Sequence, residues 1–289
     1  MGEEGGVRAR LERALAPLGP APGAWTYRAL AVGGSAHRTY LVERPDGQWV
    51  VKMRSDVVGP QLDVAAEAHA TALAAAARLA PRVVAHDAAA GTLVIEYLPD
   101  ARSWTVRDAR RDDNVVRLAA LLRRLHALPP ELPPYALARV AESYVRRAGT
   151  PTQRAARRAI ELDARARRFE ARHPPTVFCH NDLAASNVLD AGDALVLIDF
   201  EYAVSSAPIL DLAGAAMMNG YDAHARGRLI EAYYGGAPAP FDAAELDETV
   251  RMLRLLAWFW AGANARGPAS PRLYARLRRQ IGAVLDAEE

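Results

Sequence analysis

Apolar and polar residues alternate in short runs over the N-terminal third of the chain. Such alternation is typical of half-buried strands, and it predicts strands at 25–31, 39–43, 49–54, 82–86 and 92–97. An alanine-rich stretch at 63–79 lies between them and favours a helix, because alanine has the highest helix propensity. Pro99 and Asp100 then break the pattern. The first part of the chain is therefore expected to be a sheet with one helix.

Beyond this break the apolar residues change to a helical period. In 114–128 they recur at i, i+3, i+4, i+7 and i+10, which predicts one buried helix face: Val115, Leu118, Ala119, Leu122 and Leu125. Further helices are expected at 135–172, with an interruption at Pro151, and at 208–220, 223–234, 242–265 and 271–286. We therefore expect an α+β fold class with two parts, residues 1–98 and residues 99–289.

One segment of the helical part has a different pattern. Apolar runs at 176–178, 188–189 and 195–198 predict short buried strands, and Ala191, Gly192 and Asp193 predict a turn.

Polar residues flank these three runs. Asn187 follows Asp182 by five residues, and Asp199 comes twelve residues later. An isolated buried carboxylate is costly, so a strand that ends in Asp199 needs a partner such as a metal ion. In phosphoryl transfer one Asp orients the attacking hydroxyl, while an Asn and a second Asp hold Mg²⁺ against the nucleotide phosphates. The three residues fit these roles in that order. The alternative is a pair of turn caps and a loop amide, which explains each residue alone but not the three together.

Lys52 is the only lysine among the 36 lysine and arginine residues of the chain, and it lies in the predicted strand 49–54. In kinases a strand lysine contacts the nucleotide phosphates and pairs with a helix glutamate. A compact ammonium group suits this task better than a planar guanidinium. A chance surface lysine is the alternative, which the arginine bias disfavours. We expect Glu67 to be the partner, and Asp63, one turn earlier on the same face, is the competing candidate.

Gly33, Gly34 and Ser35 lie between two predicted strands, upstream of Lys52. Adjacent glycines let the backbone approach phosphates closely, and exposed amides there can cradle an anion. Taken alone, these residues are typical of an ordinary hairpin turn, and that alternative stays open. Ahead of Lys52 they become a candidate nucleotide-binding flap.

Together these residues resemble the aminoglycoside phosphotransferase and choline kinase superfamily, the small-molecule relatives of protein kinases. The resemblance extends over about 33–213, and 180–189 and 197–203 are its most specific parts. His-Asn-Asp followed by Ile-Asp-Phe-Glu-Tyr is closer to the choline and ethanolamine kinase branch than to the antibiotic-modifying branch, where His-Gly-Asp is commoner. The resemblance implies a protein-kinase-like two-lobe fold. A small N-terminal lobe with an antiparallel sheet and a helix would bind the nucleotide, and a larger, mainly helical C-terminal lobe would carry the catalytic and acceptor-binding residues.

The resemblance also implies roles for single residues. Asp182 would be the catalytic base, Asn187 and Asp199 would be Mg²⁺ ligands, and ATP or GTP would be the phosphoryl donor. Glu96 and Leu98 would belong to the hinge, whose backbone pairs with the nucleotide base.

Four more positions follow from the same resemblance. Glu201 would face the same site. His180 would brace the loop, and Asp211 would hydrogen-bond the loop backbone and take no part in the chemistry. His37 is a departure, because such kinases often have an Asn in the flap at that position.

Composition excludes several other classes of protein. A single cysteine, Cys179, excludes a disulfide framework and suits a reducing compartment, and its apolar neighbours favour a core residue over a nucleophile. The net charge is +2, and arginines are interspersed with acids along the predicted helices, so we expect no nucleic-acid partner. The longest apolar run, 255–263, is too short to span a bilayer. The acidic start has no signal-peptide pattern. These features predict a cytoplasmic enzyme without a membrane partner, and they leave the oligomeric state open.

The acceptor is expected to be a small, cationic molecule with a hydroxyl group, similar to choline, ethanolamine or thiamine. Trp258 and Trp260 belong to an aromatic cluster, and aromatic rings bind cationic groups through cation–π contacts. Residues two apart cannot share one helix face, so we expect one of the two tryptophans in the core. Trp260 and Glu201 are the first substrate candidates, and Tyr202 and Tyr221 are weaker ones.

An aminoglycoside is the alternative acceptor, and it would require many carboxylates. The sequence contains one acidic run: Asp242, Glu245, Asp247 and Glu248. This run begins a predicted helix, where acids are favoured by the helix dipole in any case. A kinase-like scaffold without activity is a third possibility. It would be expected to lack Lys52, Asp182, Asn187 or Asp199, and all four are present.

Overall fold

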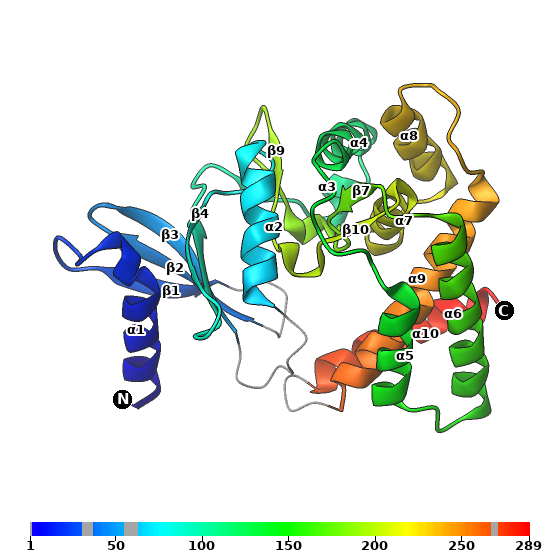
Figure 1. Cartoon of the computed structure of the whole chain (residues 1–289), viewed down its shortest axis with the longest axis horizontal. Coiled ribbons are helices and arrows are strands. Elements are labelled where there is room, and N and C mark those ends of the chain that lie inside the picture. Colours follow the sequence, from blue (N-terminus) through cyan, green and yellow to red (C-terminus); the bar gives the residue numbers. More distant parts are fainter. Residues whose placement is uncertain (1, 31–36, 55–62, 267–270) are drawn as a thin grey trace. The chain divides into compact units, whose positions relative to one another are not determined.

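The computed structural model describes residues 2–30, 37–54, 63–266 and 271–289 (Figure 1). The chain divides into two compact units. Unit 1 comprises Met1–Trp104 and Ser186–Tyr202, and unit 2 comprises Thr105–Ala185 and Ala203–Glu289. The sequence suggested a single boundary after residue 98, whereas in the structure a later segment, which carries Asn187 and Asp199, belongs to unit 1.

Unit 1 is built on a five-stranded antiparallel sheet in the order β1-β2-β3-β5-β4. Its strands are β1 (Thr26–Leu30), β2 (His37–Arg44), β3 (Gly47–Arg54), β4 (Val83–Asp87) and β5 (Thr92–Glu96). All five strands expected from the alternating pattern are present, which confirms the α+β class together with the helices described below. The differences are confined to the ends of the strands, where terminal residues have neighbours that the pattern alone does not reveal.

One face of this sheet is covered by helix α1 (Gly2–Leu15). Val51 and Met53 of β3 pack with Leu11 and Leu15 in the same core cluster. Helix α1 was not predicted from the sequence, because glycines and charged residues leave it only a narrow apolar face. Its contribution to the core is concentrated in the last turn.

The opposite face carries helix α2 (Val64–Ala76), cyan in Figure 1, where it lies against β4. Val50 of β3 packs in the cluster formed by Val64 and Ala68 of this helix. Because successive residues of a strand point to opposite faces of a sheet, Lys52 shares the face of Val50. Glu67 is buried on the side of α2 that also carries Val64 and Ala68, so it is directed toward the same face of the sheet.

A second sheet in unit 1 contains β6 (Arg102–Ser103), β8 (Val188–Asp190) and β9 (Leu195–Leu197), in the order β6-β8-β9. The hairpin β8–β9 is attached to the region around α2 in two ways. The Leu197 N–H donates to the Leu79 carbonyl oxygen at 2.8 Å, and the short helix η3 (Phe200–Tyr202) packs against α2. The end of the hairpin is thereby brought to the helix that carries Glu67.

Unit 2 is mainly helical, and α9 (Ala243–Asn264) packs against four of its helices, α5, α6, α7 and α10. The helices besides α9 are α3 (Val106–Ala109), α4 (Asp112–His126), α5 (Leu137–Ala148), α6 (Gln153–Arg172), α7 (Pro208–Asn219), α8 (Ala223–Tyr234) and α10 (Pro271–Ala287). The predicted interruption near Pro151 is confirmed, since α5 ends at Ala148 and α6 begins at Gln153. The predicted apolar face of α4 is fully buried.

A short two-stranded sheet in unit 2 pairs β7 (Val177–Cys179) with β10 (Val204–Ser206). β7 leads into the loop of residues 180–185, which we call the Asp182 loop. Within the described residues, no helix is both long and apolar enough to cross a bilayer.

Candidate active site

Lys52 lies at the centre of an ion-pair cluster in unit 1, which it forms with Glu67 and Asp199. Its Nζ forms an ion pair with Glu67 Oε1 and lies 2.6 Å from Asp199 Oδ1. The three side chains come from β3, from the buried side of α2 and from the segment that follows β9. Only 11% of the Lys52 side chain is exposed. The fold of unit 1 therefore brings together residues that are far apart in the sequence.

The competing candidate, Asp63, has a different role in the structure. It is the N-cap of α2, and its side chain accepts hydrogen bonds from the N–H groups of Ala65 and Ala66. An N-cap residue points along the helix end and satisfies donors that have no partner within the helix. The ion pair of Lys52 in α2 is formed with Glu67.

The charge of Lys52 depends on its acidic neighbours. Burial by itself lowers the pKa of Lys52, but the negative charges of Asp199, Glu67 and Glu201 outweigh this effect and hold the pKa above its ordinary value. Lys52 is therefore cationic at neutral pH. Three carboxylates around one ammonium group leave an excess of negative charge, which is an environment that favours a further cation.

Asn187 and Asp199 stand at the open end of the hairpin β8–β9. Val188 pairs with Leu197 in the ladder, and the Ile198 N–H donates to the Asn187 carbonyl oxygen at 3.0 Å. The pairing thus continues one step beyond the strands. Asp199 comes next and has φ +70°, a left-handed conformation that is uncommon for a residue other than glycine. Backbone strain of this kind is concentrated at functional sites.

Asp182 belongs to unit 2, and hydrogen bonds hold its own N–H and those of the two residues before it. Asp211 on α7 accepts from the N–H groups of His180 and Asn181, each at 2.8 Å. His180 Nδ1 accepts from the Asp182 N–H at 3.2 Å. The bracing roles expected for His180 and Asp211 are confirmed by these bonds.

Asn181 also has a left-handed backbone, with φ +63°. Glycine adopts this conformation without cost, and asparagine tolerates it better than most residues. The conformation therefore explains why either Asn or Gly can precede Asp182. The side chain adds a contact that glycine would lack, because Asn181 is hydrogen-bonded to the partly buried Tyr135.

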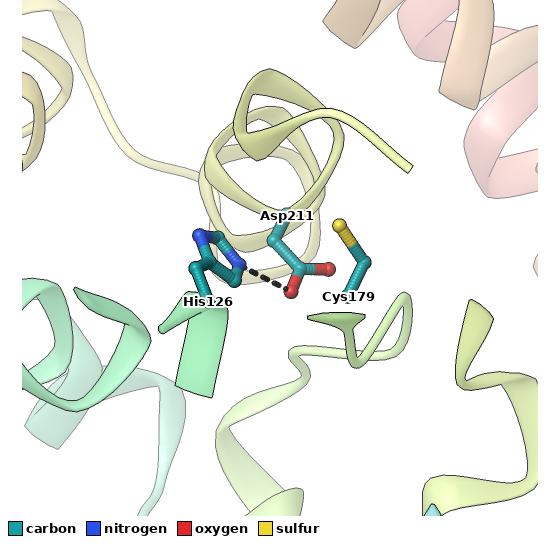
Figure 2. A group of neighbouring side chains, drawn as sticks. All are labelled: His126, Cys179 and Asp211. Carbon is teal, nitrogen blue, oxygen red and sulfur yellow. Dashed lines mark hydrogen bonds and ion pairs between the residues drawn. The ribbon is translucent and has the colours of Figure 1, made fainter. Parts of the chain in front are cut away.

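His126, Cys179 and Asp211 form a buried group behind the Asp182 loop (Figure 2). Their possible ligand atoms lie within 4.8 Å of one another, a spacing that would also suit a metal site. The contacts favour a structural role. Figure 2 marks one interaction among the three, the 3.0 Å contact between His126 Nε2 and Asp211 Oδ2. The other ring nitrogen of His126 lies 2.7 Å from the Tyr233 hydroxyl.

The protonation of this group follows from its surroundings. Burial alone would raise the pKa of Asp211. The hydrogen bond from His126 and the nearby charges together outweigh this effect and hold the pKa of Asp211 below its ordinary value. The carboxylate then accepts from His126 Nε2–H. Burial raises the pKa of Tyr233, so its hydroxyl is protonated and shares a hydrogen bond with His126 Nδ1. Burial and the charge of Asp211 hold the pKa of Cys179 well above its usual range, so the thiol is protonated and is not a nucleophile.

The remaining nucleotide candidates are in unit 1. Glu96 is the last residue of β5, and its N–H donates to the Arg82 carbonyl oxygen at 2.9 Å. The Leu98 carbonyl oxygen accepts from the Ala101 N–H at 3.2 Å. Glu201, in η3, is close enough to Lys52 to raise its pKa. The candidate flap of Gly33, Gly34 and Ser35 lies outside the described residues.

The two tryptophans of α9 have different surroundings. Trp258 is buried, and the guanidinium carbons of Arg278 and Arg158 lie 4.0 and 5.1 Å from its ring centroid. It is the core residue of the pair. Trp260 is partly exposed and packs edge-on against Tyr274, with ring centroids 5.2 Å apart. Trp260 therefore keeps an accessible surface, whereas Trp258 already contacts cations of its own chain.

Of the weaker substrate candidates, Tyr221 is buried, with 2% of its surface exposed, and Tyr202 ends η3 and is partly exposed. Asn219, which contacts the Asp182 loop through its side chain, was not predicted from the sequence. The available signal was a single polar residue at the end of an otherwise apolar helix, ahead of Gly220. Such a residue is also typical of an ordinary helix end.

Three solved structures illustrate the fold. The choline kinase LicA from Streptococcus pneumoniae is 15% identical, with a TM-score of 0.80 over 98% of this chain and 99% of that chain. A choline/ethanolamine kinase family protein from Mesorhizobium loti is 23% identical, with a TM-score of 0.72 over 97% and 94%. The macrolide 2′-phosphotransferase MphH from Brachybacterium faecium is 19% identical, with a TM-score of 0.62 over 95% and 97%. These similarities confirm the kinase-like two-lobe fold.

Among curated protein sequences, none matches this chain. The model of one sequence family does match, over residues 26–249, and its description is "Phosphotransferase enzyme family". The matched region includes the ion-pair cluster, the Asp182 loop and the hairpin β8–β9. The chain therefore belongs to the phosphotransferase enzyme family, and it is a small-molecule phosphotransferase with an alcohol group as acceptor.

Proposed function

We propose that this phosphotransferase moves the γ-phosphate of ATP or GTP to a hydroxyl of a small, cationic acceptor similar to choline, ethanolamine or thiamine. The observation that carries the nucleotide half of the proposal is the ion-pair cluster. In kinases the strand lysine must be paired with a helix glutamate while an Asp holds the metal ion. Lys52 contacts both Glu67 and Asp199 in this way.

Mg²⁺ fits the donor set at this position. Asn187 and Asp199 supply an amide oxygen and carboxylate oxygens, which are the ligands that Mg²⁺ prefers, and both belong to one hairpin end. The excess negative charge around Lys52 favours a divalent cation as well. When bound, Mg²⁺ would neutralise charge on the nucleotide phosphates.

Asp182 is the proposed base of the reaction. Carboxylates are weak bases for an alcohol, so the main task of Asp182 is to position the acceptor hydroxyl and to take its proton late in the transfer. The backbone on which this task depends is held by hydrogen bonds that the His180 and Asp182 N–H groups donate to the side chains of Asp211 and His180, respectively.

The preference for a small amino alcohol over an aminoglycoside depends on the contacts of the acidic run, Asp242, Glu245, Asp247 and Glu248. A polycationic aminoglycoside would need carboxylates that are not already paired. Each member of the run has a partner in unit 2: Asp242 caps α9, Glu245 pairs with Arg172 and His173, Asp247 with Arg226, and Glu248 with Arg165. Trp260, in contrast, offers a partly exposed aromatic surface to a single cationic group.

A nucleotide-turnover assay with purified protein tests this function. Choline, ethanolamine, thiamine, homoserine and several aminoglycosides are offered as acceptors, with ATP or GTP and with Mg²⁺ or EDTA. We expect Mg²⁺-dependent turnover that one of the small amino alcohols stimulates, and the phosphorylated product identifies the acceptor. Stimulation by aminoglycosides alone would overturn the acceptor preference. No stimulation by any of them, with nucleotide still bound, would favour a scaffold.

Trp260→Ala sharpens the acceptor test. If Trp260 contacts a cationic acceptor, this variant raises KM for the acceptor by about 2- to 30-fold, which corresponds to about 0.5–2 kcal/mol for one cation–π contact, and leaves KM for the nucleotide unchanged. Val284→Ala, at an exposed position of α10, is the matched control. An unchanged acceptor KM in Trp260→Ala would remove this residue from the acceptor site.

A further inference from the structure

Asn219, the last residue of α7, binds the Asp182 loop through its side chain. Its Oδ1 accepts from the Ala185 N–H, and its Nδ2 donates to the Leu183 carbonyl oxygen, each at 2.9 Å. Nδ2 also donates to the Ala215 carbonyl oxygen within α7, at 2.9 Å. Asn219 is 1% exposed, so these bonds are made away from water.

The two contacts of Asn219 hold the loop after Asp182, and Asp211 holds the loop before it. Asp211 holds the backbone of His180 and Asn181, and Asn219 holds that of Leu183 and Ala185. Both side chains belong to α7. One rigid helix therefore fixes the chain immediately before and immediately after Asp182.

The Ala185 N–H needs such an acceptor. Ala185 begins the short helix η2 (Ala185–Asn187), and the first N–H groups of a helical turn have no partner inside it. The Asn219 amide acts there as a cap that comes from another element. Its second group satisfies the Leu183 carbonyl oxygen, so a single amide orients two peptide groups of the loop.

The residues that Asn219 contacts also lie between two proposed functional residues in the sequence. Four residues separate Asp182 from Asn187, and Asn219 binds two of them, Leu183 and Ala185. A loop with fewer accessible conformations loses less entropy when the reacting groups align.

We infer that Asn219 is a positioning residue for phosphoryl transfer: it holds the loop after Asp182 as Asp211 holds the loop before it. The inference rests on the proposed function for its kinetic consequence, but not for its structural one. Asn219 acts through the backbone of the loop and contacts no reacting group.

Asn219→Ser tests the inference most selectively. A serine hydroxyl can still bond the carbonyl oxygen four residues earlier in the helix, which is that of Ala215, but it is too short to make both loop contacts. We expect kcat to fall by about 10- to 100-fold, the cost of a small misplacement of reacting groups, while KM for the nucleotide changes less than about twofold. Asn219→Ala, which also loses the bond to Ala215, serves as a second variant.

Asn114→Ala is the matched control. Asn114 is also a buried asparagine of unit 2, and its Nδ2 donates to a backbone carbonyl oxygen, that of Asp108, at 2.9 Å. Its bonds do not reach the Asp182 loop. We expect a comparable loss of unfolding free energy in urea and an unchanged kcat. An unchanged kcat in folded Asn219→Ser, or an equal fall of kcat in Asn114→Ala, overturns the positioning role.

Amide hydrogen exchange separates this inference from the proposed function. In the wild type we expect protection of the Ala185 amide, and in Asn219→Ser faster exchange in 183–187 with unchanged exchange in α9. If no acceptor is phosphorylated but this local change occurs, the proposed function fails while the hold on the loop stands. If the Ala185 amide exchanges freely in the wild type, the inference is wrong, whether or not the variants fold.

Discussion

The ion-pair cluster of unit 1 and the Asp182 loop of unit 2 are held by different kinds of interaction. In the cluster, charged side chains contact one another directly, as Lys52 does with Glu67 and Asp199. In the loop, the side chains of Asp211 and Asn219 bind peptide groups.

The difference indicates that the two regions have different physical roles. Direct charge contacts set the electrostatic potential at a site, and they are sensitive to any change of charge. Hydrogen bonds to the backbone set the position of a segment and leave its side chains to act elsewhere. We therefore expect charge changes in the cluster to alter stability strongly, and changes behind the loop to alter geometry with smaller energetic effects.

The largest effect is expected when Asp182 itself is changed. Asp182→Asn keeps the size of the side chain and the backbone bonds of the loop but removes the carboxylate. Because general-base and positioning effects contribute up to about 10⁴-fold, we expect kcat to fall by about 10³-fold or more with an unchanged melting temperature. Near-wild-type turnover in the purified variant would end the assignment of Asp182.

Lys52→Met tests the direct charge contacts. It leaves the carboxylates of Glu67 and Asp199 facing each other without their cation, and breaking a buried ion pair costs about 3–5 kcal/mol. We expect a loss near the lower end of this range, since the side chain of Asp199 is 22% exposed, measured as the free energy of unfolding in urea.

Lys52→Arg is the control for Lys52→Met. It preserves the charge, so it should lose less stability than the methionine variant, yet transfer should still be impaired because a planar fork replaces a compact ammonium group. Equal stability of Lys52→Met and the wild type would show that the cluster contributes no net stabilisation.

Asp211→Asn tests the hold on the loop through its pH dependence. The folded-state pKa of Asp211 is lowered, from an ordinary value near 3.9. Its ionised form therefore contributes stability above about pH 4, and that contribution is lost as the pH falls through the folded-state pKa. We expect the variant to be about 2 kcal/mol less stable than the wild type at pH 7, with a smaller difference below pH 4.

Urea unfolding of both proteins from pH 7 to pH 3 provides the measurement for Asp211→Asn. A stability difference that stays constant over this range would contradict the ionised state of Asp211 in the folded protein.

The smallest effect is expected for Tyr233→Phe. The variant removes one hydroxyl and leaves His126 Nδ1 without its hydrogen-bond partner at 2.7 Å, which costs about 1 kcal/mol. His126 still donates to Asp211 through Nε2, so kcat should change less than about twofold. A large fall in kcat without a loss of stability would show that Tyr233, on α8, also helps to position the Asp182 loop.

Much of the fold could be predicted because hydrophobic periodicity is a local property. The alternation around Val51 and the i, i+3, i+4 spacing around Leu118 were sufficient to predict β3 and α4. Helix α1 was missed, since the buried residues described in it, Leu11, Ala14 and Leu15, form too short a pattern to be distinguished from chance.

The polar contacts could be predicted only where a motif supplied them. Spacing and residue type singled out Lys52, Asp182 and Asp199, and the resemblance supplied the role of Asp211. Asn219 has no such signal, because an asparagine before glycine at a helix end is ordinary. Its contact with Ala185 joins residues 34 apart and exists only because α7 packs beside the loop.

By itself the sequence determined most of the elements, the family and a short set of chemically suitable residues, since each of these depends on neighbouring positions. The tertiary structure decided which of two acids pairs with Lys52, which tryptophan is buried and that the segment of residues 186–202 belongs to unit 1. Lys52 and Asp199 are 147 residues apart. Whether two such groups meet depends on the packing of all the elements between them, and no local pattern contains that information.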